Sequence, residues 1–222
     1  MSPTVRSMTF RVTDEQGFSF DPGQWVSLIL PVDGERLIRA YSLASAPRDD
    51  STFDLAVTHV IDGPASDYLY TMQPGERLHL TGPFGTFLIH RPIDRPVYLI
   101  ATGTGVAPFR SMLHDMLEHQ KVTVPVTLVF GVRTEGDILY RAEFESLART
   151  HPNFRFIPTL SRPAPDWAGA RGYVQVTAGN LLLPRHDADI YVCGVRKMVN
   201  ETRAKLKEWE YDRKHIHYER YD

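Results

Sequence analysis

Short apolar runs, several of them alternating with polar residues, follow one another through the first part of the chain, up to about residue 89. Clusters rich in Gly, Pro and Asp separate these runs, which is typical of short strands joined by tight turns in an antiparallel sandwich or barrel. One further stretch, over residues 67–72, predicts a short helix. The expected strands span residues 7–13, 25–31, 52–60, 78–80 and 86–89.

The spacing of apolar residues changes at residues 90–96, where Pro92 and Pro96 interrupt the pattern and predict a linker. Beyond this linker, apolar runs alternate with segments of helical spacing, which is typical of a parallel α/β sheet covered on both faces. The pattern therefore predicts two domains, over residues 1–92 and 97–222. We expect strands over residues 97–101, 124–130, 154–160 and 189–193, and helices over residues 108–119, 140–149, part of 173–182, and 196–209.

Composition narrows the function classes. The chain has 222 residues, a net charge of −2 and 42% hydrophobic residues, which argues against a dedicated nucleic-acid binder because such domains are usually strongly basic. No apolar run reaches the ~18 residues of a transmembrane helix, and the first six residues lack the apolar core of a signal peptide. We therefore expect a cytoplasmic protein with neither a membrane nor a nucleic acid as partner. The single cysteine, Cys193, excludes an internal disulfide and any iron–sulfur cluster held by three or four cysteines of this chain.

A glycine-rich segment directly follows the first strand of the α/β part. Gly103-Thr104-Gly105-Val106-Ala107-Pro108 opens a helix, and such a turn lets the backbone approach a phosphate at the helix N-terminus. The segment departs from the dinucleotide-binding fingerprint, because Pro108 stands where a third glycine is usual. No acidic residue ends the next strand either, as it would in an NAD-type unit. On this motif alone, a tight turn without a ligand stays open.

A second candidate, Arg39-Ala40-Tyr41-Ser42, ends a strand of the first part. The arginine offers a planar fork for a phosphate, and the tyrosine offers a face for a flat ring. The serine hydroxyl can bond to a ring nitrogen. On a regular strand, however, residues 39 and 41 share one face and residue 42 points to the other. Taken alone, the segment favours an exposed strand with a solvated arginine.

Together with Val192-Cys193-Gly194, these two segments resemble the ferredoxin–NADP reductase family. The resemblance implies an antiparallel Greek-key β-barrel that binds a flavin, followed by a Rossmann-like α/β domain that binds a nicotinamide nucleotide. Further similar segments lie at residues 20–26, 63–66 and 82–85, in the family's order, so that the resemblance covers essentially the whole chain. It implies an NAD(P)H-dependent flavin oxidoreductase.

The resemblance implies roles for five residues of the first domain. Arg39 is expected to bind the flavin phosphate, Tyr41 to lie against the flavin ring, and Ser42 to hydrogen-bond near the ring nitrogen that receives the hydride. Gly63 and Ser66, at the start of a short helix, are expected to bind the flavin phosphates through the serine hydroxyl and backbone donors.

In the second domain, the resemblance places Gly103, Thr104 and Gly105 along the pyrophosphate and ribose of the nucleotide. Cys193 and Gly194 are expected beside the nicotinamide ring. From its spacing alone, Cys193 is a small buried hydrophobic residue at the end of a strand.

Tyr221, near the C-terminus, is expected to cover the flavin face that the nicotinamide must occupy; the alternative is a tyrosine packed on its own domain. With Ser42 and Cys193, it completes the residues expected nearest the hydride transfer. His215 and His217 alternate as strand residues do and lack a third ligand nearby, so no metal site is predicted.

The choice of nucleotide depends on the segment after the third parallel strand. Ser161, Arg162 and Arg171 can bind a 2′-phosphate, and Tyr173 can stack on adenine. This pattern resembles NADP-using relatives and favours NADPH. However, NADH-using oxygenase reductases also carry a Ser-Arg-Pro turn, and Pro163 completes that turn here. NADH therefore stays open.

The resemblance implies that hydride passes from NADPH or NADH to FAD, or less favourably FMN. Electrons then pass singly to a separate protein: a ferredoxin, a flavodoxin or an oxygenase component. Two alternatives stay open, a reductase of free flavin and a redox-responsive electron-transfer subunit of a larger complex. The basic helix over residues 196–209 offers a surface to an acidic carrier, although a solvated face explains it equally.

Overall fold

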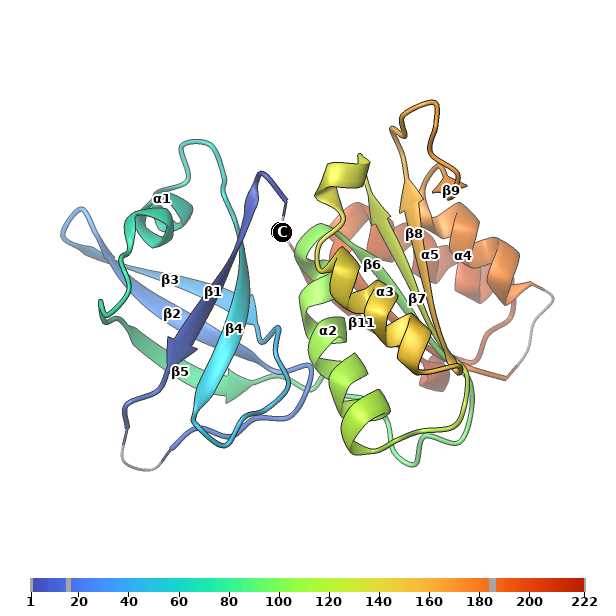
Figure 1. The fold of residues 1–222 in the computed structure, drawn as a ribbon, viewed down its shortest axis with the longest axis horizontal. Helices are drawn as coiled ribbons and strands as arrows, with labels where there is room; N and C mark the ends of the chain where they lie inside the picture. Colours follow the sequence, from blue (N-terminus) through green and yellow to red (C-terminus); the bar gives the residue numbers. More distant parts are fainter. Residues whose placement is uncertain (1, 15–16, 184–186, 222) are drawn as a thin grey trace. The chain divides into compact units, whose positions relative to one another are not determined.

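The computed structural model describes residues 2–14, 17–183 and 187–221, and its chain divides into two compact units (Figure 1). We call them the β unit, which holds Pro3–Ile89 and Ala107–Gln120, and the α/β unit, which holds Ser2, His90–Val106 and the described residues from Lys121 onward. The helix that follows the glycine-rich turn is thus part of the β unit. Domain boundaries at residues 92 and 97 stay a prediction.

Two antiparallel sheets build the β unit. In one, β2 lies between β3 and β5; in the other, β1 pairs with β4. An isolated bridge between Leu43 and Leu55 links the residue after β3 to β4. The elements are β1 (Val5–Arg11), β2 (Trp25–Val32), β3 (Glu35–Ser42), β4 (Thr52–Thr58), α1 (Pro64–Thr71), β5 (His79–Phe84) and α2 (Ala107–His114), which continues as a π-helical turn over Asp115–His119.

The core of the β unit follows the period of two expected of a half-buried strand. Val26, Leu28 and Leu30 of β2 are fully buried, while the residues between them are partly exposed. The strand predicted over residues 86–89 is absent. Phe87 and Ile89 are nevertheless buried. The apolar pattern therefore indicated buried side chains correctly, although the segment forms no strand.

The α/β unit contains a six-stranded parallel sheet in the order β11-β10-β6-β7-β8-β9. Because β6 lies between β7 and β10, the chain order reverses at β6, and the crevice outside such a switch point is where open α/β sheets bind ligands. The strands are β6 (Val97–Thr102), β7 (Val126–Val132), β8 (Phe154–Leu160), β9 (Ala170–Arg171), β10 (Asp189–Val195) and β11 (Ile216–Tyr221).

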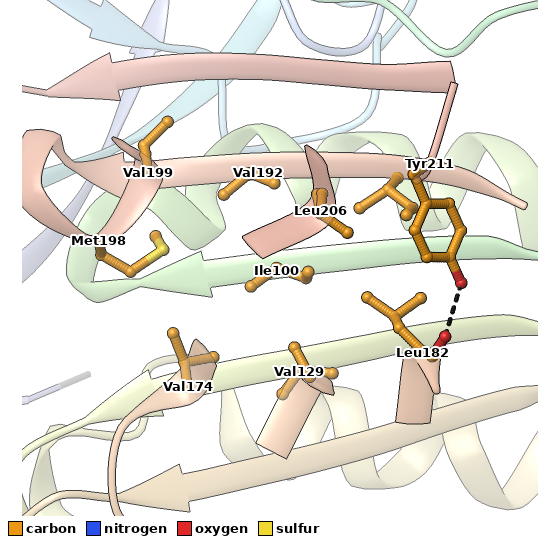
Figure 2. Packing of buried hydrophobic residues seen from close by; sticks show 11 residues of the cluster. Ile100, Val129, Val174, Leu182, Val192, Met198, Val199, Leu206 and Tyr211 are labelled. Atoms are coloured by element: carbon orange, nitrogen blue, oxygen red, sulfur yellow. Dashed lines mark hydrogen bonds between the residues drawn. The ribbon is translucent and has the colours of Figure 1, made fainter. Parts of the chain in front are cut away.

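Helices cover both faces of this sheet, as its continuous apolar strands predict. Figure 1 shows α3 (Arg141–Thr150) on one face and α4 (Val174–Leu182) with α5 (Arg196–Glu208) on the other. Figure 2 shows the second layer, where Ile100, Val129 and Val192 of the sheet pack against α4 and α5. The Tyr211 hydroxyl donates to the carbonyl of Leu182 at 2.8 Å and closes one end of this layer. In the described ranges, no helix has the length and apolar character needed to cross a membrane.

Candidate functional site

Two turns meet at the switch point of the parallel sheet. The strands β6 and β10 are neighbours in register, with Ala101 opposite Cys193, so the segments after them emerge side by side. The first segment is the glycine-rich 3₁₀ turn Gly103–Val106, and the second is Gly194, which leads into α5.

The glycines of these turns have different surroundings. A Cβ on Gly105 would lie 2.5 Å from the carbonyl oxygen of Cys193, so this glycine permits close packing of the two turns. A Cβ on Gly103 would meet nothing within 4 Å, and its φ of +54° is left-handed. Gly103 therefore leaves open space beside its backbone, whereas Gly105 is packed against the neighbouring turn. Contact of Gly105 and Thr104 with a nucleotide stays a prediction.

The thiol of Cys193 is buried at the end of β10 and hydrogen-bonds the side chain of Tyr221 on the neighbouring strand β11. Burial raises the pKa of Cys193 well above its usual value, and the charge of Glu219 adds to this, against the hydrogen bonds from Tyr221 and the Gly194 backbone. Cys193 is therefore a neutral thiol at physiological pH. The structure brings Gly105, Gly194, Cys193 and Tyr221 into one cluster.

The residues expected to select the nucleotide follow β8, and their side chains differ in exposure and in hydrogen bonding. The backbone N–H groups of Ser161 and Arg162 donate to the carbonyls of Val132 and Arg133, at 3.0 and 2.8 Å, and fix the turn beside the end of β7. The Arg162 side chain is exposed and has neither a hydrogen bond nor an ion pair among the described residues. Tyr173, which precedes α4, is 70% exposed.

Arg171 differs from Arg162. Its Nη2 lies 2.9 Å from the carbonyl oxygen of Pro165 and 2.6 Å from that of Trp167, and it also reaches Ala164. This guanidinium closes the loop between β8 and β9. Sequence reasoning treated the two arginines as equivalent, but of the two side chains only that of Arg162 has no hydrogen bond or ion pair in the described part of the chain. The local sequence carries no signal for this difference, because it depends on how the loop folds back.

In the β unit, Arg39 and Tyr41 lie on β3 and Ser42 ends it. Arg39 is exposed, and one of its N–H groups donates to the carbonyl of Ile38 at 2.8 Å. Tyr41 is half-buried against the core, and burial raises its pKa while the charge of Arg39 opposes the rise. Ser42 is buried opposite Trp25. A charged fork and an aromatic face thus occur close together on this strand.

The helix α1 begins in a tight loop that excludes a side chain at Gly63. A Cβ there would lie 2.8 Å from the Cβ of Val60 and 2.9 Å from the hydroxyl of Ser66. That hydroxyl accepts from the N–H of Val60 at 3.0 Å and lies 2.9 Å from the carbonyl of Gly63. Phosphate binding by this hydroxyl stays a prediction that requires the loop to release it. The N–H groups of Ala65 and Ser66, in the first helical turn, have no intrahelical acceptor and suit an anion.

Sequence reasoning missed two residues close to these segments. The hydroxyl of Thr102, at the end of β6, lies 3.4 Å from the N–H of Val195 and links the two turns. Arg110, in α2, lies 3.1 Å from a carboxylate oxygen of Asp54 on β4. The sequence separates Arg110 from Asp54 by 56 residues, so no spacing rule identifies the pair.

Comparisons with known proteins also find two domains in this order, although the NAD-binding match includes α2, which belongs to the β unit in the structure. Residues 1–89 match the family of oxidoreductase FAD-binding domains, and residues 99–204 match the family of oxidoreductase NAD-binding domains. Ferredoxin–NADP reductase B from Sorangium cellulosum is 42% identical, over 100% of this chain and 93% of that protein. The glycine betaine monooxygenase reductase subunit from Chromohalobacter salexigens is 32% identical, but the match covers only 60% of that protein.

Solved structures show the same fold. The cytochrome P450 reductase GcoB from Amycolatopsis is 29% identical and superposes with a TM-score of 0.88, over 99% of this chain and 66% of that chain. The FAD/NAD-binding domain of the nitric oxide dioxygenase from Vibrio cholerae is 25% identical, with a TM-score of 0.87 over 99% of this chain and 93% of that one.

Proposed function

The chain belongs to the ferredoxin–NADP reductase family of flavin oxidoreductases, and from this premise we propose that it is an NADPH-dependent reductase that carries FAD and passes electrons to a separate protein. The observation that carries the proposal is the pair of closely packed turns at the ends of β6 and β10. They leave Gly103 open at the switch point of the sheet, where a nucleotide binds in open α/β sheets.

The residues of the β unit fit FAD. Arg39 would bind a phosphate, together with the free N–H groups of Ala65 and Ser66 at the start of α1. Gly63 keeps that helix start clear, because any side chain there would collide with Val60. Tyr41 would lie against the flavin ring, with Ser42 beside it. Bound FAD would supply a two-electron acceptor that can release its electrons one at a time.

The α/β unit would hold the nicotinamide nucleotide. The turn from Gly103 would approach the pyrophosphate, and Cys193 and Gly194 would lie beside the nicotinamide. Since the Cys193 thiol is neutral, it would place no charge beside a ring whose charge changes during hydride transfer. Tyr221 would cover the flavin face until the nucleotide displaces it.

NADPH is favoured over NADH by Arg162. Its exposed guanidinium, which has no partner among the residues that the structure describes, is suited to a 2′-phosphate, and the exposed ring of Tyr173 is suited to the adenine. Arg171 would contribute its charge while it remains bonded to its own loop. For the electron acceptor we propose a ferredoxin, with a flavodoxin or an oxygenase component as the other candidates. Ferredoxin is part of the name of the 42% identical relative.

The decisive experiment measures oxidation of NADPH and NADH in parallel by the purified protein, with ferricyanide as acceptor. We expect a yellow protein that retains FAD after desalting, as identified by mass, and a higher kcat/KM with NADPH. A colourless protein that reduces only added flavin would instead identify a free-flavin reductase. A flavin-containing protein that oxidises neither nucleotide would contradict the enzymatic function.

A further inference from the structure

A buried carboxylate in the β unit binds two arginines. Asp54 of β4 is only 6% exposed. Arg48 contacts both of its oxygens, at 3.1 and 2.7 Å, and Arg110 of α2 contacts one of them at 3.1 Å. The Thr9 hydroxyl donates to the other oxygen at 2.8 Å. This set of charges and hydrogen bonds lies outside the segments expected to bind flavin or nucleotide.

Arg110 makes a second bond from the same nitrogen. Its Nη1 donates to the carbonyl of Ala44 at 2.9 Å, while the N–H of Ala44 donates to the carbonyl of Asp54 at 2.8 Å. One guanidinium therefore links α2 to a side chain and to the backbone of two neighbouring segments. The helix is also packed against the loop at Gly23, where a Cβ would lie 2.6 Å from the Cε of Met112.

This cluster is unlike a simple stabilising contact. Burying charged groups carries a desolvation cost that their attraction often only balances, so such pairs are frequently no more stabilising than apolar residues of similar size. The cluster instead fixes the orientation of α2, because a planar guanidinium bonded to two acceptors holds the helix in one position.

The helix that Arg110 anchors directly continues the glycine-rich turn. Gly103–Val106 belongs to the α/β unit and Ala107–Gln120 belongs to the β unit, so the chain passes from one unit to the other at the Val106–Ala107 peptide bond. An anchor on the first helical turn therefore constrains the end of the segment that would hold the nucleotide.

We propose that Arg110, held by Asp54 and Ala44, is a positioning residue that fixes the glycine-rich turn for hydride transfer. The inference rests on the proposed function. Rate depends steeply on the placement of the reacting atoms, whereas binding of the nucleotide depends mainly on contacts at its phosphates. The loss of the anchor should consequently lower kcat more than it changes KM.

The test compares Arg110→Met, Arg110→Lys and the wild-type holoenzyme. In Arg110→Met, Asp54 keeps Arg48 as a partner, so we expect the variant to fold. We expect kcat with NADPH and ferricyanide to fall roughly ten- to a hundredfold, with KM for NADPH and the Kd of NADP⁺ from calorimetry changed less than about threefold. Arg110→Lys should recover part of kcat, because the ammonium can still reach Asp54. Arg141→Met is the matched control, since Arg141 is paired with Glu145 on the exposed side of α3.

Hydrogen exchange supplies a readout that does not depend on activity. Peptides over residues 103–110 should exchange faster in Arg110→Met, and peptides over β8 should be unchanged. An unchanged kcat with faster exchange at residues 103–110 would overturn the proposal, as would uniform acceleration of exchange throughout the chain, which indicates general destabilisation. A rise in KM and Kd without a loss of kcat would also overturn it. If the wild-type protein oxidises neither NADPH nor NADH, the proposed function itself fails and the proposal fails with it; an active wild type with an unaffected variant contradicts the proposal alone.

Discussion

A Cβ on Gly194 would lie 2.2 Å from the hydroxyl oxygen of Thr102. Gly194 also has a φ of +145°, a backbone conformation that residues with a side chain rarely adopt. The turns after β6 and β10 are thus packed so closely that one of them admits no side chain at this point.

Gly194→Ala should therefore destabilise the protein. Overpacking together with the unfavourable φ should lower the free energy of unfolding by about 2–4 kcal/mol, measured by urea denaturation. Gly136→Ala is the control, because a Cβ there meets nothing within 4 Å, and it should change the stability by less than about 1 kcal/mol. Equal effects of the two substitutions would contradict this account of the turns.

Arg162→Ala should raise KM for NADPH about ten- to a hundredfold, because hydrogen bonds to a charged group contribute about 1.5–3 kcal/mol. KM for NADH should stay within about twofold of the wild-type value. Steady-state kinetics with both nucleotides measures the effect. Arg171→Ala is the comparison: since Arg171 bonds the loop carbonyls of Pro165 and Trp167, its loss should lower stability and impair both nucleotides. An equal rise of KM for both nucleotides in Arg162→Ala would remove the argument for NADPH.

Cys193 should resist alkylation in the native protein. Its thiol is buried and its pKa is raised by that burial, so the reactive thiolate forms only after local opening. Iodoacetamide at pH 8 should modify it at least about a hundredfold more slowly than in urea, as followed by mass spectrometry. Glutathione in the same solution controls for reagent activity. Comparable rates in the native and unfolded protein would show that the sulfur is accessible.

Tyr221→Ser tests whether this ring competes with the nicotinamide. If Tyr221 covers the flavin, loss of a stacking interaction of about 0.5–1.5 kcal/mol should tighten NADP⁺ binding roughly two- to tenfold. The flavin absorption spectrum should shift at the same time. Tyr221→Phe keeps the ring but removes the hydrogen bond to Cys193, and should leave both measurements close to the wild-type values. If Tyr221→Ser changes neither the Kd nor the spectrum, the ring is packed only on its own unit.

Asp54 should make stability depend on acid pH. Burial acts to raise the pKa of Asp54, but hydrogen bonds from Arg48, Thr9 and Arg110 and the charge of Arg48 outweigh it, and the pKa lies below its usual value. Because the folded-state pKa is the lower one, the stabilisation is complete above the unfolded-state pKa of about 4. It is lost as the pH falls through the folded-state value.

We expect Asp54→Asn to reduce the free energy of unfolding by about 2–4 kcal/mol at pH 7, because it leaves Arg48 and Arg110 without their carboxylate. Below about pH 4 the difference between wild type and variant should narrow. Urea denaturation at a series of pH values measures both effects. A difference that stays constant from pH 7 to pH 3 would show that the carboxylate does not gain its stabilisation from these partners.

Local pattern predicted most of the elements. The strand expected over residues 154–160 is β8, Phe154–Leu160, and the helix expected over residues 196–209 is α5, Arg196–Glu208. In both segments, the apolar spacing and the neighbouring residues favour the element that the structure shows. The failure at residues 86–89 has a physical cause: Phe87 is buried, and burial alone leaves an apolar pattern whether or not the backbone finds a pairing strand.

The sequence by itself determined the two kinds of sheet, the family, and the glycine-rich turn after β6, because these depend on the period of apolar residues and on motifs within a few positions. Tertiary structure alone decided that Gly105 packs against Cys193 while Gly103 stays open. It also decided that the Arg171 side chain closes a loop, while that of Arg162 has no partner in the described part of the chain. It also decided that Arg110 reaches Asp54, 56 residues away. Each of these outcomes depends on which distant backbone or carboxylate folding brings within a few ångströms, and no local spacing encodes that distance.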